Sequence, residues 1–188
     1  MKSPKMRLAM AGALVAMFVV GTPANVYGQA TPPAKIAILE FQRVMRESAA
    51  ANDIKVQVDQ RRQVYQNEIT KQEQELREAE QELSRQATIL APDALAQKRR
   101  EFESRVAQVQ TGMQARKREL DQAYAYGMKE VQRALTVIIA ALAKERGFNL
   151  VLPHGQIVFA DSSLNITDEA LRRLNAQLPS VKVPLIQN

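Results

Sequence analysis

Residues 54–90 read IKVQVDQRRQVYQNEITKQEQELREAEQELSRQATIL, and the spacing of their apolar residues is the main indication of the fold. Its apolar residues recur mostly at steps of three or four, or of their sum, and most other positions are Gln, Glu, Arg or Lys. So narrow an apolar stripe is typical of a coiled-coil seam rather than of a helix inside a globular core. The sequence therefore predicts one long helix that begins at a cap near Asn52 or Asp53. The seam positions are Ile54, Val58, Tyr65, Ile69, Leu76, Ala79, Leu83, Ala87 and Leu90.

A second apolar stripe follows a short interruption at residues 91–93. Proline disfavours helical backbone in the residue before it, so Pro92 separates the two stripes. Two seams joined by a short break predict an antiparallel coiled-coil hairpin over residues 54–146, with its tip near residues 91–93. The second seam consists of Leu95, Phe102, Val106, Val109, Met113, Leu120, Tyr124, Met128, Val131, Leu135, Ile138 and Leu142.

Charges are distributed unequally over the two predicted helices. Residues 67–82 carry six acids against two bases, and residues 85–118, which surround the tip and the start of the second helix, carry eight bases against three acids. Folding back at the tip would bring Glu68 to Arg116. It would also bring Glu82 to Arg105 or Arg100. Opposite charges on facing edges fix the register of paired helices, although each exposed pair contributes only about 0–1 kcal/mol.

Shorter segments on either side of the hairpin predict a small body. Residues 35–41 have the apolar residues of a short buried strand, and residues 41–51 have helical spacing. Residues 148–152 and 157–160 are strand-like, and the Pro-His-Gly-Gln turn between them predicts a β-hairpin. A last helix is expected to begin with Thr167 as its N-cap.

Together these segments predict an α+β fold. Residues 35–53 and 147–179 form the body, from which the hairpin projects, and residues 180–188 form a tail. Gly147 has the position of a C-terminal cap for the second long helix. Pro184 is expected to keep the tail extended.

The first thirty residues have the three parts of a secretory signal peptide: a basic start, an apolar run at residues 8–20, and a polar stretch with proline and small residues. The run is shorter than the roughly 18 residues of a membrane-spanning helix, so it favours a cleaved signal peptide. The alternative interpretation is an uncleaved membrane anchor. Cleavage is expected after Gly28 or Ala30. The mature chain would then lie in an exported compartment.

Composition excludes most kinds of catalytic site. The chain of 188 residues contains no Cys and one His, which excludes thiolate zinc sites, thiol nucleophiles and a His cluster within one subunit. The single His154 lies in a predicted turn. With no Cys and no second His to act with it, we expect that the protein is not an enzyme and binds no metal or cofactor. The formal charge of +6 falls to +3 without Lys2, Lys5 and Arg7. A nucleic-acid partner is therefore not expected either.

The order of these elements resembles that of the Skp family, also called OmpH, of Gram-negative periplasmic chaperones. The most specific parts are residues 35–39 and 148–174, including Asp-Ser-Ser at 161–163 and Ile-Thr at 166–167. The resemblance implies a homotrimer in the periplasm, whose three hairpins enclose a cavity. It further implies that unfolded outer-membrane β-barrel proteins bind in this cavity, without ATP, and are kept from aggregating.

Two residue sets are candidates for these roles. The arm set could attract acidic clients or anionic lipid headgroups, or it could be only the solvated, ion-paired side of a coiled coil. The tip itself, residues 88–97, has Asp93 as its single charge, which departs from the basic tips expected of the family. A passive coiled-coil envelope scaffold is the alternative function. The arm set is Lys98, Arg99, Arg100, Arg105, Arg116, Lys117, Arg118, Phe102 and Met113. The body set, expected to be buried against copies of itself in the trimer, is Ile36, Ile38, Leu150, Leu152 and Val158.

Overall fold

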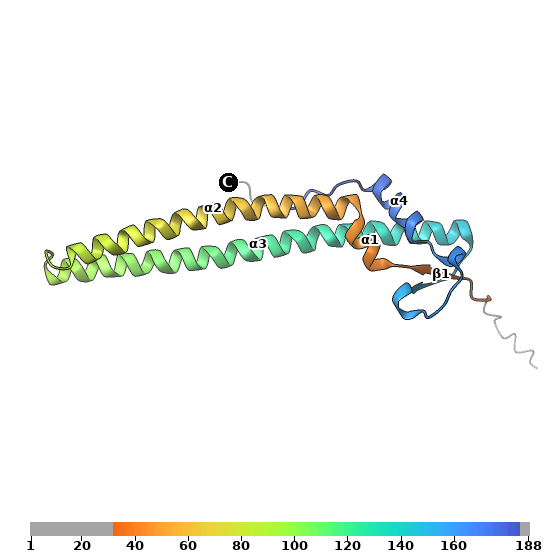
Figure 1. The fold of residues 1–188 in the computed structure, drawn as a ribbon, viewed down its shortest axis with the longest axis horizontal. Coiled ribbons are helices and arrows are strands. Elements are labelled where there is room, and N and C mark those ends of the chain that lie inside the picture. Colours follow the sequence, from red (N-terminus) through yellow and green to blue (C-terminus); the bar gives the residue numbers. More distant parts are fainter. Residues whose placement is uncertain (1–31, 185–188) are drawn as a thin grey trace, which may run out of the picture. The chain divides into compact units, whose positions relative to one another are not determined.

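A computed structural model describes residues 32–184 of the chain (Figure 1). The signal peptide predicted for residues 1–30 lies outside the described residues. The described residues from Ala34 onward belong to one compact unit. In chain order the elements are β1 (Ile36–Leu39), α1 (Phe41–Glu47), α2 (Ala49–Gln86), α3 (Pro92–Arg146), β2 (Leu150–Pro153), two short 3-10 turns (His154–Gln156 and Ser162–Leu164) and α4 (Thr167–Gln177).

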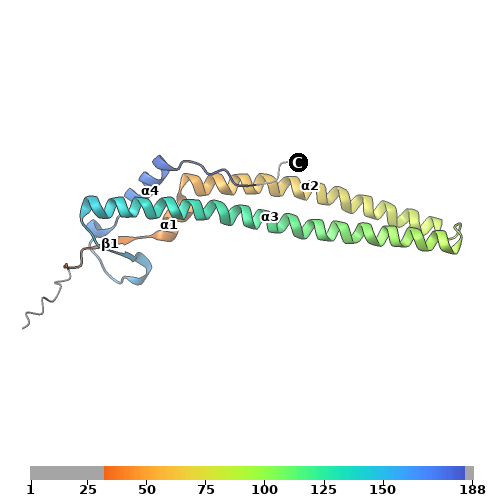
Figure 2. The same cartoon turned by 180° about the vertical axis from the view of Figure 1, so that it is seen from behind.

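The two long helices α2 and α3 lie side by side and antiparallel, as Figures 1 and 2 show. They have 38 and 55 residues. At a rise of 1.5 Å per residue these lengths correspond to about 57 and 80 Å. The chain thus has the predicted helical hairpin, and α3 starts with Pro92 at its N-terminal end. Gly147 caps α3 with a φ of 73°, as predicted, in a left-handed conformation that glycine adopts without strain.

The first long helix begins earlier than predicted. Its cap is Ser48, whose hydroxyl accepts a hydrogen bond from the Ala51 N–H at 3.3 Å. The expectation of a cap at Asn52 or Asp53 is wrong because both residues lie inside α2. The helical segment predicted for residues 41–51 is instead divided at Ser48, so that α1 is a separate short helix.

Burial along the hairpin changes from the body toward the tip. Near the body Ile54 and Leu135 are fully buried, because α1, α4 and the tail also cover this part of the seam. Farther out Leu76 and Phe102 are only half-buried, since two helices alone cannot enclose a side chain. The outer seam therefore keeps part of its apolar surface accessible.

The sheet differs from the predicted β-hairpin. β1 and β2 pair in parallel, with Ile36 opposite Leu150 and Ile38 opposite Leu152. Residues 157–160 form no strand in the described structure. The physical reason is that the helical hairpin returns the chain beside β1, where β2 finds a parallel partner through a long crossover. The expected hairpin of 148–152 with 157–160 is therefore wrong.

The two faces of this sheet have different surroundings. Ala37, Leu39 and Val151 pack into the core formed with the helices. Side chains alternate between the faces of a strand, so Ile36 and Leu150 lie on the opposite face. These two are 39% and 43% exposed. This second face is therefore open at its Ile36–Leu150 end, whereas Ile38 on the same face is only 3% exposed.

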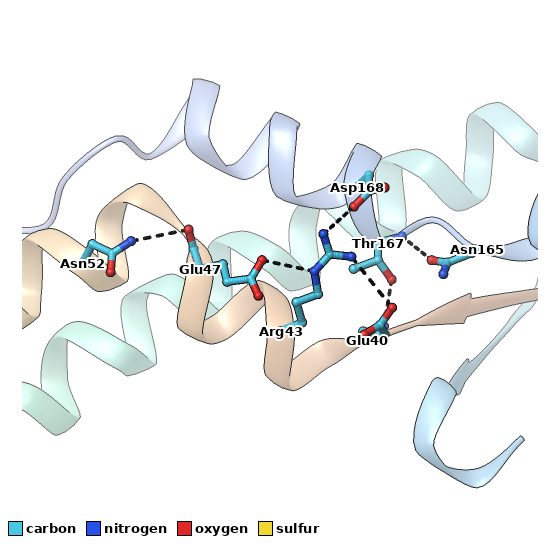
Figure 3. Close-up of polar contacts among 7 residues, drawn as sticks. All are labelled: Glu40, Arg43, Glu47, Asn52, Asn165, Thr167 and Asp168. Carbon is cyan, nitrogen blue, oxygen red and sulfur yellow. Dashed lines mark hydrogen bonds and ion pairs between the residues drawn. The ribbon is translucent and has the colours of Figure 1, made fainter.

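A polar cluster holds α1 against the start of α4 (Figure 3). The Arg43 guanidinium lies 3.1 Å from Glu47 and 2.9 Å from Asp168, and these carboxylates raise its pKa. Thr167 is the first residue of α4 and not its cap, contrary to prediction. Its buried hydroxyl accepts from the Glu40 N–H at 2.9 Å, while the Asn165 side chain accepts from the Thr167 N–H at 2.8 Å.

Candidate functional site

Three grooves follow the outer and middle parts of the α2–α3 seam. We name them the tip groove, the middle groove and the inner groove, and their volumes are about 250, 370 and 370 Å³. The tip groove is lined by Ala79, Glu82, Leu83, Gln86, Lys98, Glu101, Phe102 and Arg105. The middle groove is lined by Gln72, Glu75, Leu76, Arg105, Gln108, Val109, Gly112 and Arg116. The inner groove is lined by Arg62, Tyr65, Gln66, Ile69, Met113, Gln114, Arg116, Lys117 and Leu120.

Each groove combines apolar seam residues with cations. The seam supplies the apolar part because the heptad-like spacing places its residues between the helices, and cations of α3 lie beside it. Six residues of the predicted arm set therefore come to the grooves, while Arg99, Arg100 and Arg118 lie outside all three. The six are Lys98, Phe102, Arg105, Met113, Arg116 and Lys117.

The predicted charge register is found at one position and fails at another. Arg116 lies 2.6 Å from Glu68 across the seam, as expected. Glu82 instead binds Arg85 of its own helix at 2.7 Å, and this hydrogen-bonded guanidinium lowers its pKa. The pairing of Glu82 with Arg105 or Arg100 was thus a wrong expectation, because a partner three residues away on the same helix is closer. Among the described residues Arg105 makes no ion pair within 4.0 Å, so its charge is available at the rim of two grooves.

Tyr65 forms a polar centre that the sequence did not reveal. It was predicted only as a seam residue, and it is 5% exposed. Its hydroxyl donates to Glu119 Oε2 at 2.6 Å, and burial together with this bond raises its pKa. The guanidinium carbons of Arg61 and Arg116 lie 4.8 and 5.3 Å from its ring centroid, in the range of cation–π attraction. Arg61 lies one helical turn before Tyr65, and this spacing was the sequence signal for their contact.

The predicted body set is divided between buried and exposed positions. Ile38 is buried and Leu152 is half-buried, whereas Ile36 and Leu150 are exposed at the sheet. Val158 is fully exposed, and Phe159, which the sequence analysis did not single out, is 89% exposed. Of these residues, Ile38, Val158 and Phe159 line one hollow together with the 154–162 loop.

Within residues 32–184 no group of three or more His, Asp or Glu side chains is placed to hold a metal ion. No helix in that range is both long and apolar enough to cross a membrane.

Among known proteins, no curated one matches this chain. A solved structure of a candidate outer membrane chaperone (OmpH-like) from Caulobacter crescentus CB15 is similar, with a TM-score of 0.74 and 20% sequence identity. The similarity covers 87% of this chain and 98% of that one, which shows a shared fold. The family model of outer membrane proteins (OmpH-like) matches residues 35–174. Because that match covers well over half of the sequence, the chain belongs to the OmpH-like, or Skp, family.

Proposed function

We propose that this protein is an ATP-independent periplasmic holdase that binds unfolded outer-membrane β-barrel proteins between the arms of a homotrimer. Membership of the OmpH-like family supports a chaperone role in general. The observation that carries the finer proposal is the outer hairpin, where apolar seam residues and cations line three open grooves. The periplasmic location rests on the predicted signal peptide and on the family.

The grooves suit a chain without fixed structure. None is a deep enclosed pocket, and each offers a small apolar surface next to a cation. A long unfolded chain can occupy several such places at once, and linked weak contacts raise the effective concentration of each remaining one. The same cations are the groups that would contact anionic lipid headgroups.

The exposed Ile36–Leu150 end of the sheet supports the proposed assembly into a trimer. A two-stranded sheet is marginal by itself, and its edge strands can pair further. Ile36 and Leu150 expose apolar surface there, as do Val158 and Phe159 of the neighbouring loop. Large exposed apolar residues of this kind are candidates for burial in an interface. Three copies would bury these residues and place three hairpins around one space.

The trimer is tested by Val158→Asp. This change places a charge in the proposed interface, so sedimentation should report dissociation while circular dichroism reports retained helices. Ile89→Asp is the matched control, because Ile89 is 82% exposed at the turn between α2 and α3. Dissociation in neither variant, or equal dissociation in both, contradicts the assigned interface.

The holdase function is tested by dilution of a urea-unfolded outer-membrane β-barrel into buffer with the mature protein, followed by light scattering. We expect scattering to be suppressed. The double variant Arg105→Gln/Lys117→Gln removes two rim cations worth about 0.5 kcal/mol each, which corresponds to about fivefold weaker binding. The control Arg99→Gln/Arg118→Gln removes two cations of the same helix that lie outside all three grooves. Undiminished scattering with the wild-type protein would favour the passive scaffold. Equal weakening by both variants would show that net charge, and not the position of the cations at the grooves, determines client binding.

A further inference from the structure

The chain after α4 returns along the hairpin as an extended segment, visible beside α2 in Figures 1 and 2. Val181 and Val183 are 8% and 9% exposed, while Lys182 between them and Pro184 after them are exposed. This alternation is that of a strand with one face buried. The segment lies beyond residue 174, where the family match ends.

Side chains of α2 hold the backbone of this segment. The Gln57 amide nitrogen donates to the Val181 carbonyl at 2.8 Å, and its oxygen accepts from the Val183 N–H at 3.2 Å. Asp53 Oδ2 accepts from the Val181 N–H at 3.3 Å and from the Gln57 amide at 2.7 Å. All contacts to the tail in this network are to main-chain groups, so they do not depend on which residues the segment contains.

The side chain of Val183 lies where α3 has no side chain. A Cβ on Gly127 would lie 2.8 Å from Ile54 Cδ1 and 3.0 Å from Val183 Cγ1. Gly127 therefore lets Val183 and Ile54 approach the backbone of α3 closely. We call the surface formed by Asp53, Ile54, Gln57 and Gly127 the tail groove.

We infer that the tail groove is a binding site for extended peptide segments with apolar side chains two residues apart, and that the chain's own tail fills it until such a segment displaces the tail. Backbone hydrogen bonds that give affinity, combined with places for alternate side chains, are a general mode of strand recognition. Strands of outer-membrane barrels alternate apolar and polar residues, so unfolded barrels supply this pattern many times. The inference rests on the proposed function and specifies a further place where a client binds.

Occupation by the tail would make the groove selective for clients that are already held. A tethered segment competes at high effective concentration, so a free peptide binds weakly. If the tail fills the groove nine tenths of the time, the apparent affinity of a competing segment falls about tenfold. A client anchored on the arms is itself at high local concentration and can compete.

The first test uses the wild-type protein and hydrogen exchange. The amides of Val181 and Val183 should be protected in the free protein and should lose protection when a saturating amount of urea-unfolded β-barrel is added. Protection that persists with bound client overturns the inference. If the client does not bind at all, the proposed function fails first, and the two failures are thus distinguished.

The second test releases the tail within the full chain. In the variant Val181→Asp/Val183→Asp, we expect a fluorescent peptide of sequence LPSVKVP, the wild-type residues 178–184, to bind at least tenfold more tightly than to the wild type. Adding Gln57→Ala should abolish this binding, whereas Gln63→Ala, an exposed amide on the same helix, should leave it unchanged. No gain in the released variant, or binding that ignores Gln57→Ala, overturns the inference, provided that circular dichroism shows retained helices. If the released variant loses its helices, the exchange measurement on the wild type decides.

Discussion

The two glycines inside α3 provide a matched pair of perturbations. Gly112 and Gly127 both lie inside the same continuous helix. From sequence alone, either glycine could permit bending or be a tolerated surface residue. The structure separates them. A Cβ on Gly112 would meet nothing within 4 Å, whereas a Cβ on Gly127 would be 2.8 Å from two carbons of Ile54 and 3.0 Å from Val183.

The expected free energies follow from these distances. Replacing a helical glycine by alanine gains about 0.8–1.0 kcal/mol of helix propensity, so Gly112→Ala should stabilise the protein by roughly that amount. Gly127→Ala gains the same propensity but overpacks a filled site, which costs about 1–3 kcal/mol. Its net effect should range from about zero to a destabilisation of about 2 kcal/mol. The difference between the variants, about 1–3 kcal/mol, measures the close approach alone.

Urea unfolding followed by circular dichroism at 222 nm measures both variants. The protein concentration must be the same throughout, because assembly adds to apparent stability by mass action. Hydrogen exchange should also show weaker protection of the Val183 amide in Gly127→Ala and unchanged protection in Gly112→Ala. Equal stabilisation by the two substitutions would refute the reasoning, since it would mean that Gly127 has free space around it.

Three further predictions concern stability. Tyr65→Phe removes the hydrogen bond to Glu119 and should lower the free energy of unfolding by about 1–2 kcal/mol at neutral pH, as measured in urea. Because the pKa of Tyr65 is raised, the stability that this bond contributes is present below pH 10 and is lost as the pH rises through the raised value. The variant should therefore lack this alkaline loss of stability. The pKa of Glu145 is lowered from 4.5 chiefly by its hydrogen bond with Arg173, so the wild type should lose stability as the pH falls through the lowered value, and thermal melts of Glu145→Gln should show a smaller acid decline. Thr167→Val leaves the Glu40 N–H without its acceptor and should lower the free energy of unfolding by about 1–3 kcal/mol. Thr136→Val, at an exposed position of α3, should change the unfolding midpoint little.

Local spacing was enough to predict the long elements. The two apolar stripes predict α2 and α3, Gly147 predicts the end of α3, and complementary charge predicts the contact of Glu68 with Arg116. Each of these depends on residues that are close in sequence or on one fold-back at a proline. Such features are governed by helix geometry and by the identity of cap residues.

The parts that could not be predicted depend on partners far along the chain. β2 pairs in parallel with β1, more than one hundred residues earlier, and no local pattern distinguishes this from a hairpin with 157–160. Thr167 was expected to cap its own helix, but its hydroxyl serves the backbone before α1. The tail groove was missed for the same reason, since Gln57 reads as one more polar residue on a coiled-coil surface.

The central claim is that the assembled arms hold an unfolded client. Native mass spectrometry of the mature protein, alone and with an unfolded outer-membrane β-barrel, tests it most directly. We expect a trimer that takes up one client for every three chains. A trimer that leaves the client unbound would contradict the holdase function, and a monomer would contradict the architecture on which that function depends.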